Sequence, residues 1–191
     1  TVLIAMCLSC LSCGPVSVSP TTPASHVLTG QVTYDARQPT ARGTSEAVEA
    51  RPARFVDLAL VRGGVVVAEC RTDAEGRFSI AGPEGVDALR VLARVRVRGH
   101  DVAIARDPIG TETHTMEVPV EGSEVAVHAV DRTGDAGAFH VVDTLLRGLD
   151  VVHEWTGHTL PPVFAYWVRG GTREWSYYRG ERPIGSGRFA L

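Results

Sequence analysis

The residues whose spacing comes nearest to a metal-binding motif lie between His153 and His158, where Glu154 follows the first histidine. A zinc-hydrolase helix carries histidines four positions apart, which places both imidazoles on one side, about 40° apart. Here the histidines are five positions apart, or about 140° around a helix, and Gly157 between them is expected to end that helix. We therefore predict neither a metal site nor a catalytic residue here, and no cofactor.

The remaining histidines suggest no catalytic set either. His140 and Asp143 are one helical turn apart, and we expect a surface hydrogen bond between them. Four further histidines are scattered over predicted strands and loops and are expected at the surface: His26, His100, His114 and His128. No Gly-x-Ser-x-Gly motif is present.

Three cysteines, Cys7, Cys10 and Cys13, have a spacing that is also found in iron–sulfur proteins. Their spacers are apolar and the run lacks a fourth ligand, so residues 2–13 are better explained as the core of a signal peptide. The run is too short to span a bilayer, which takes about 20 residues. Cys70 is then expected to be a lone thiol on a buried strand.

The apolar run ends in Leu11-Ser12-Cys13-Gly14, which resembles the lipobox of bacterial lipoproteins. The resemblance implies that Cys13 carries the lipid; Cys10, preceded by Leu8-Ser9, is a second choice. We expect an exported protein anchored to a membrane of the bacterial cell envelope, or a secreted protein if Cys13 is not lipidated. Residues 14–25, rich in Pro, Ser and Thr, are predicted to form an extended tether.

The charge pattern argues against a nucleic-acid partner. The 191 residues carry a net charge of −3, and all 19 cationic residues are arginines. Arginines alternate with apolar residues from Leu89 to Arg98, which predicts a strand with one buried face and one solvated face. No aromatic side chain that could stack on a base is interleaved with these arginines.

Residues 26–130 are predicted to form a mainly β domain, an antiparallel Ig-like or transthyretin-like sandwich of seven or eight short strands. The polar stretch 36–52 is expected to be a surface loop. Thr72 to Phe78 is predicted to form the turn of a hairpin, in which Asp73 bonds its own backbone and Gly76 supplies a positive φ.

Residues 131–191 differ in character. Apolar positions from Phe139 to Val152 recur every three or four residues, which predicts one amphipathic helix with Asp135 as N-cap. Short strands follow, predicted as a small β-hairpin unit. Because a lone helix with short strands buries its apolar face poorly, we expect these residues to open a second, possibly truncated, domain.

Two resemblances bear on function. The residues Thr72-Asp73-x-x-Gly76-x-Phe78, with Gly30-Gln31-Val32, resemble the carboxypeptidase regulatory-like (transthyretin-like, peptidase-associated) domain family. This implies an accessory or binding module. The segment 137–146, followed by Pro161-Pro162-Val163 and Trp167, is similar to a region preceding the zinc helix in large bacterial surface proteins. That likeness implies a metallopeptidase-like domain downstream and assigns no metal ligand within these residues.

Three hypotheses remain open. The chain is a lipid-anchored accessory module that is not catalytic by itself, a binding module for a carbohydrate or a protein, or a structural spacer. The second hypothesis needs an aromatic binding surface, for which the sequence offers Trp155 and the four residues Trp167, Trp175, Tyr177 and Tyr178.

Overall fold

The computed structural model describes residues 25–41, 43–131, 134–169, 177–179 and 188–190. The chain is mainly β with one helix, α1 (Ala136–Thr156). The strands are β1 (Ser25–Thr40), β2 (Gly43–Pro52), β3 (Val56–Arg62), β4 (Val65–Arg71), β5 (Arg77–Pro83), β6 (Ala88–Val97), β7 (His100–Ala105), β8 (Thr115–Pro119), β9 (Glu124–Ala129), β10 (Val163–Tyr166), β11 (Tyr177–Arg179) and β12 (Arg188–Ala190).

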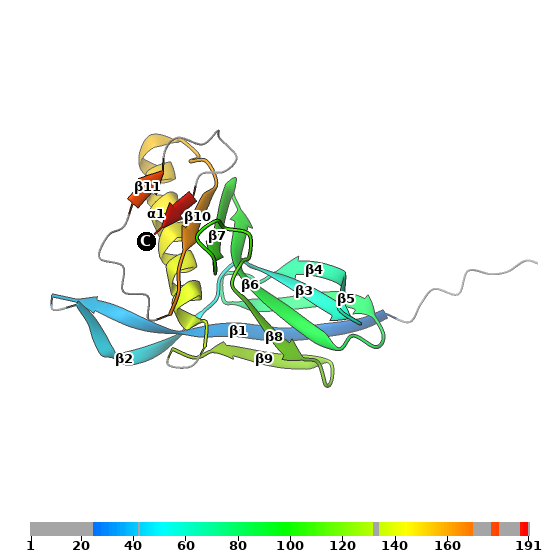
Figure 1. Cartoon of the computed structure of the whole chain (residues 1–191). Coiled ribbons are helices and arrows are strands. Elements are labelled where there is room, and N and C mark those ends of the chain that lie inside the picture. The colour runs from blue at the N-terminus through cyan, green and yellow to red at the C-terminus, as the bar shows by residue number, and fades with distance from the viewer. Residues whose placement is uncertain (1–24, 42, 132–133, 170–176, 180–187, 191) are drawn as a thin grey trace, which may run out of the picture.

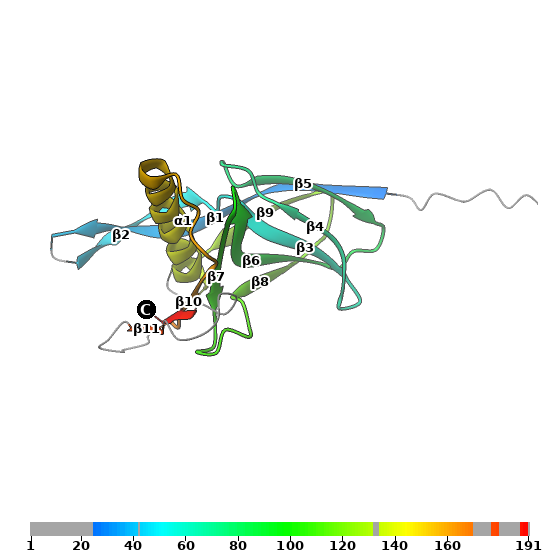
Figure 2. The same cartoon turned by 90° about the horizontal axis from the view of Figure 1, so that it is seen from above.

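The strands form two mixed sheets. In the first sheet β1 is central, with β2 and β5 antiparallel to it and β9 parallel to it. The second sheet has the order β11-β12-β10-β7-β6-β3-β4, with β8 also paired to β6 (Figures 1 and 2). Because β10 runs parallel to β7, and β9 parallel to β1, the expectation of a purely antiparallel arrangement was wrong.

The prediction of a loop over residues 36–52 was also wrong. These residues continue β1 and form β2, a two-stranded arm that extends past α1 in Figure 1. Tyr34 and Ala36 lie on the buried face of this arm, whereas most side chains from Gln38 to Ala50 are exposed. The arm contains two prolines and few apolar residues, which is why its sequence resembles that of a loop.

The core lies between the two sheets and continues under the helix. Leu28 and Val32 of β1 and Leu89 and Val91 of β6 are fully buried in one cluster. In β6 these apolar residues alternate with half-buried or exposed arginines, which confirms the predicted two-faced strand. Burial of apolar surface contributes about 25 cal/mol per Å² removed from water. Because the apolar residues of β6 lie on one face, this free energy determines which face points into the core.

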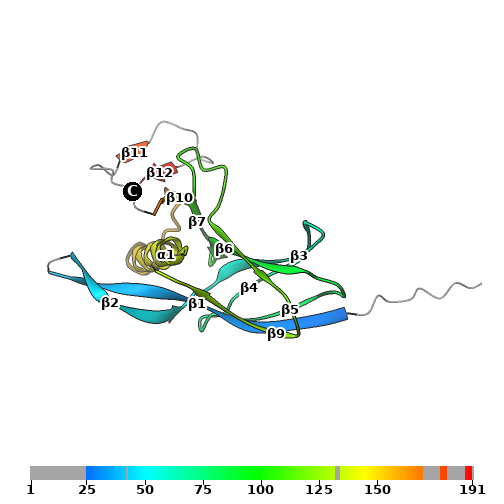
Figure 3. The ribbon, with the colours of Figure 1, turned by 60° about the horizontal axis from the view of Figure 1, so that its bottom comes forward.

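The helix α1 belongs to the same core. Phe139, Val142 and Leu146 are buried together with residues of both sheets, and Figure 3 shows α1 seated between β1 and the β7–β10 edge. Gly157, with φ of 69°, ends α1 as predicted. The helix therefore covers its apolar face within the described residues, so the argument that an uncovered helix requires a second domain fails. That residues 131–191 open a second domain stays a prediction.

The turn at Thr72–Phe78 does not join two paired strands. β4 pairs with β3 in the second sheet, and β5 pairs with β1 in the first, so the turn is a corner between the sheets. The predicted local geometry is present. Asp73 Oδ1 accepts hydrogen bonds from the backbone N–H of Glu75 (2.9 Å) and of Arg77 (2.8 Å), and Gly76 has φ of 73°. The hairpin prediction failed because a turn motif does not specify the partners of its flanking strands.

Candidate functional site

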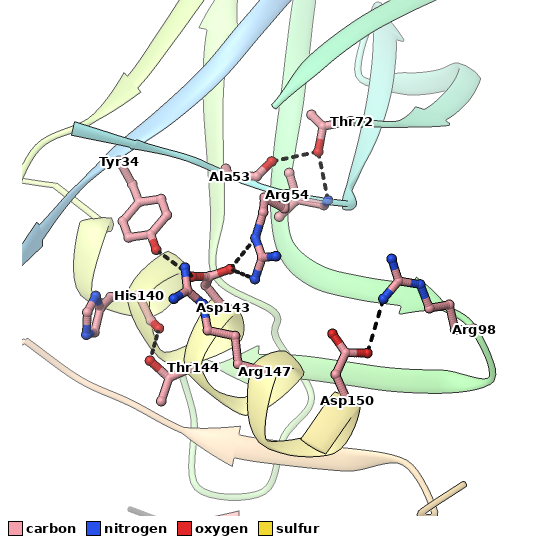
Figure 4. Close-up of polar contacts among 11 residues, drawn as sticks. Tyr34, Ala53, Arg54, Thr72, Arg98, His140, Asp143, Thr144, Arg147 and Asp150 are labelled. Carbon is pink, nitrogen blue, oxygen red and sulfur yellow. Dashed lines mark hydrogen bonds and ion pairs between the residues drawn. The ribbon is translucent and has the colours of Figure 1, made fainter. Parts of the chain in front are cut away.

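Within the described part of the chain, a buried polar cluster centres on Asp143 in the middle of α1. Its side chain is 7% exposed, accepts hydrogen bonds from two other segments of the chain, and forms an ion pair within α1 (Figure 4). Tyr34 of β1 donates its hydroxyl at 3.0 Å, and Arg54, between β2 and β3, donates Nε at 2.8 Å. Arg147, one turn along α1, pairs with Asp143 at 3.0 Å. The predicted surface bond from His140 to Asp143 is replaced by these contacts.

Local structure places each of these groups. On α1, Asp143 follows Phe139 by four residues and so lies close to the buried face, about 40° from Phe139. The connection that carries Arg54 is held by buried Thr72, whose hydroxyl donates to the carbonyl of Ala53 (2.6 Å) and accepts from the N–H of Val56 (3.0 Å). Thr72 of the predicted turn therefore contributes to this cluster by positioning Arg54.

The cluster perturbs two titratable groups. Burial, and then the negative charge of Asp143, raise the pKa of Tyr34 well above its ordinary range. Burial, and then the positive charge of Arg51, lower the pKa of His140 below its ordinary value. The His140 ring lies edge-on to Tyr34, with 6.1 Å between ring centroids, and its buried Nδ1 has no hydrogen-bond partner. The Tyr34 hydroxyl is thus fixed as a donor, and the cluster connects α1 to the first sheet.

A second junction surrounds Trp167, which follows β10. Its backbone N–H donates to the Ala105 carbonyl (3.1 Å), and its carbonyl lies 2.7 Å from Nε2 of buried His114. Nδ1 of His114 lies 3.0 Å from Asp135, the residue before α1. The Trp167 indole lies so close to Gly137 that a Cβ there would be 2.2 Å from the ring. Asp135 is the N-cap by position, but its side chain makes no cap hydrogen bond.

Of the residues considered for an aromatic binding surface, the structure describes the side chains of Trp155 and Trp167. Trp167 is half-buried against the core and is a packing residue rather than an open platform. Trp175 and the side chains of Tyr177 and Tyr178 lie outside the described residues. Trp155, near the end of α1, is 81% exposed.

Phe78, the last residue of the Thr72-Asp73-x-x-Gly76-x-Phe78 motif, is buried against Gly30. A Cβ added at Gly30 would lie 2.9 Å from the Phe78 ring.

Two of the histidines predicted at the surface are buried: His100 and His114. A third, His128, is exposed and belongs to a chain of contacts that sequence reasoning missed. The Thr33 hydroxyl lies 2.8 Å from His128 Nδ1, and His128 Nε2 lies 3.0 Å from Asp35. This order of hydroxyl, imidazole and carboxylate matches that of a nucleophilic triad. It lies on an open sheet face, however, which does not exclude water from a reacting group.

Metal and thiol chemistry find no support in the part of the chain that the structure describes. Within it, no group of three or more His, Cys, Asp or Glu is arranged to hold a metal ion. Cys70 is half-buried, and burial, together with the negative charge of Asp57, raises the pKa of its thiol to about 11. Its thiolate population at neutral pH is accordingly very small. Cys13 lies outside the described residues.

Comparison with known proteins identifies no family. The sequence matches no protein-family model and no curated protein. A solved structure of a 9R-lipoxygenase from Cyanothece PCC8801 aligns with a TM-score of 0.31 at 13% sequence identity. The alignment covers 78% of this chain and 27% of the lipoxygenase chain, so this chain spans about a quarter of that protein's length. A likeness this low carries no argument about fold or function.

Proposed function

We propose that this chain is an exported bacterial lipoprotein, anchored through Cys13, whose β-domain is an accessory module without catalytic activity of its own. The observation that carries the proposal is the order of the N-terminal segments: an apolar run, Leu11-Ser12-Cys13-Gly14, and an uncharged Pro/Ser/Thr-rich tether.

Acyl chains on Cys13 would be sufficient to hold the protein on a membrane. Each acyl CH₂ that enters the bilayer contributes about 0.8 kcal/mol, so two or more chains hold a protein on a membrane stably. Among the described residues, no helix is both long and apolar enough to cross a bilayer. Cys70 is a poor competitor for modification, because its thiol is half-buried and its pKa is raised.

The test compares Cys13→Ser with Cys10→Ser, each expressed from the protein's own gene with its leader. We expect the wild type and Cys10→Ser to sediment with membranes and to incorporate a labelled fatty acid. Cys13→Ser is expected to lose the label and to appear in the soluble or unprocessed fraction. Retention of the label by Cys13→Ser would refute the assignment of the lipid to this residue.

The finer fold assignment belongs to the same proposal. We infer that the two sheets form a carboxypeptidase regulatory-like sandwich, supported by the Thr72–Phe78 corner and by the close approach of Gly30 to Phe78. A metallopeptidase-like domain downstream is part of the proposal. Sequencing the gene beyond the codon for Leu191 tests it: an open frame that reaches a His-Glu-x-x-His helix is expected, and an immediate stop codon would remove that domain.

A binding module is the second candidate, favoured by the exposure of Trp155 and of neighbouring Val151, which is 41% exposed. An exposed Trp is a common anchor in protein interfaces. In glycan and protein binding screens, a ligand whose binding is lost in Trp155→Ala but retained in Arg147→Ala would support this function. Unchanged binding in Trp155→Ala would exclude this surface.

A further inference from the structure

The buried imidazole of His114 faces a hydrogen-bond acceptor at each of its nitrogens. Nδ1 lies 3.0 Å from a carboxylate oxygen of Asp135, and Nε2 lies 2.7 Å from the backbone carbonyl oxygen of Trp167. These three residues come from the β7–β8 connection, the start of α1 and the end of β10. The ring therefore joins three elements that are distant in the sequence.

The two acceptors determine which form of the ring fits. A neutral imidazole has one N–H and one lone pair, so it can donate to only one of the two oxygens and would direct its lone pair at the other. An imidazolium donates from both nitrogens. The adjacent Trp167 ring, whose centroid is 5.2 Å from that of His114, adds an attraction for a cation. The geometry is thus that of a doubly protonated ring.

Charged groups of both signs lie around His114. Asp135 faces it with a carboxylate and also takes a hydrogen bond of 3.3 Å from the Arg106 guanidinium on its other oxygen. Arg106 is further held by the Thr115 carbonyl at 2.8 Å. Glu112, on the same connection as His114, offers its backbone carbonyl to the Arg106 N–H. Asp135 therefore shares its charge between His114 and Arg106.

We propose that His114 is a protonated clamp that holds the β10 edge onto the second sheet and loosens when the ring loses a proton. β10 pairs with β7, and β12 pairs with β10, so the strands beyond β10 are attached to the sheet through this edge. Loss of one donor removes the hydrogen bond either to the Asp135 oxygen that faces Nδ1 or to the Trp167 carbonyl. The edge then opens more often as the pH rises. This device is independent of the membrane anchor.

The direct test is nitrogen NMR of the His114 side chain in the full chain, combined with exchange of the Trp167 amide. Spectra are recorded from about pH 5 to about pH 9, the range in which histidines titrate. At the acid end we expect protons on both ring nitrogens and slow exchange of the Trp167 N–H. After correction for intrinsic exchange, we expect protection to fall roughly ten- to a hundredfold once the ring is neutral, the range for a lost charge-assisted hydrogen bond.

Two variants separate a clamp from ordinary packing. His114→Gln keeps a donor but does not titrate, so protection of Trp167 is expected to lose its pH dependence. His128→Gln, which removes an exposed histidine on the first sheet, is the matched control and is expected to keep the wild-type profile. A His114 ring with a single N–H throughout the range, or Trp167 protection that follows the same pH profile in His114→Gln, would overturn the proposal.

Discussion

Arginine and carboxylate side chains meet in two regions of this protein that differ in their access to water. On the outer face of β6, an arginine ladder consists of Arg90, Arg94 and Arg96, paired with Glu117, Asp101 and Asp57. Except for Asp57, these side chains are between 27% and 52% exposed. In the Asp143 cluster, by contrast, the carboxylate is 7% exposed and bridges α1 to β1 and to the β2–β3 connection.

This difference indicates that the stability lost on breaking an ion pair or hydrogen bond depends on whether the remaining partner is exposed or buried. An exposed arginine that loses its partner returns to water, so exposed pairs contribute about 0–1 kcal/mol. A buried hydroxyl or guanidinium that loses its acceptor keeps its desolvation cost, and breaking such a pair costs roughly 3–5 kcal/mol. Asp57 tests this distinction, because it is buried but both of its arginine partners are about half exposed.

The largest effect is expected from Asp143→Ala. It leaves the Tyr34 hydroxyl and the Arg54 guanidinium without an acceptor, and we expect a loss of about 3 kcal/mol in the free energy of unfolding. Urea denaturation measures this loss. Asp101→Ala on the ladder is the matched control, and a similar loss in both variants would break the comparison.

Asp57→Ala is expected to cost less, about 1–2 kcal/mol, because Arg71 and Arg96 can turn toward water when the carboxylate is removed. The same denaturation experiment applies. A loss as large as that of Asp143→Ala would show that burial of the carboxylate alone, and not of its partners, sets the cost.

Tyr34→Phe is expected to cost about 1 kcal/mol at neutral pH, because Asp143 retains its two arginines. The pKa of Tyr34 is raised in the folded state, so above about pH 10 the unfolded chain releases this proton while the folded chain retains it. The wild type therefore loses stability as the pH rises above that value. The loss should be smaller in Tyr34→Phe, and identical pH profiles for the two proteins would contradict this assignment.

The smallest effect is expected from Arg90→Ala, which removes the exposed pair with Glu117 and should change stability by less than about 1 kcal/mol. Salt screens such a pair. The difference from the wild type should therefore shrink further when denaturation is repeated in high salt. A large difference that does not depend on salt would assign Arg90 a packing role.

The sequence predicts the parts of the fold that depend on local pattern. The alternation in β6, the Asp73–Gly76 turn and the end of α1 at Gly157 all follow from neighbouring residues. The β1–β2 arm was missed because Tyr34 and Ala36 bury only one face of it. The buried position of Asp143 had a sequence signal, four residues after Phe139. The contacts of His114 had none, because Asp135 and Trp167 are 21 and 53 residues away.

The proposed membrane anchor is tested most directly by the intact mass of the mature protein extracted from cell membranes. The account predicts a chain that begins at Cys13 and carries the additional mass of its acyl groups. A mature chain that begins at another residue, or one that begins at Cys13 without added mass, would contradict it.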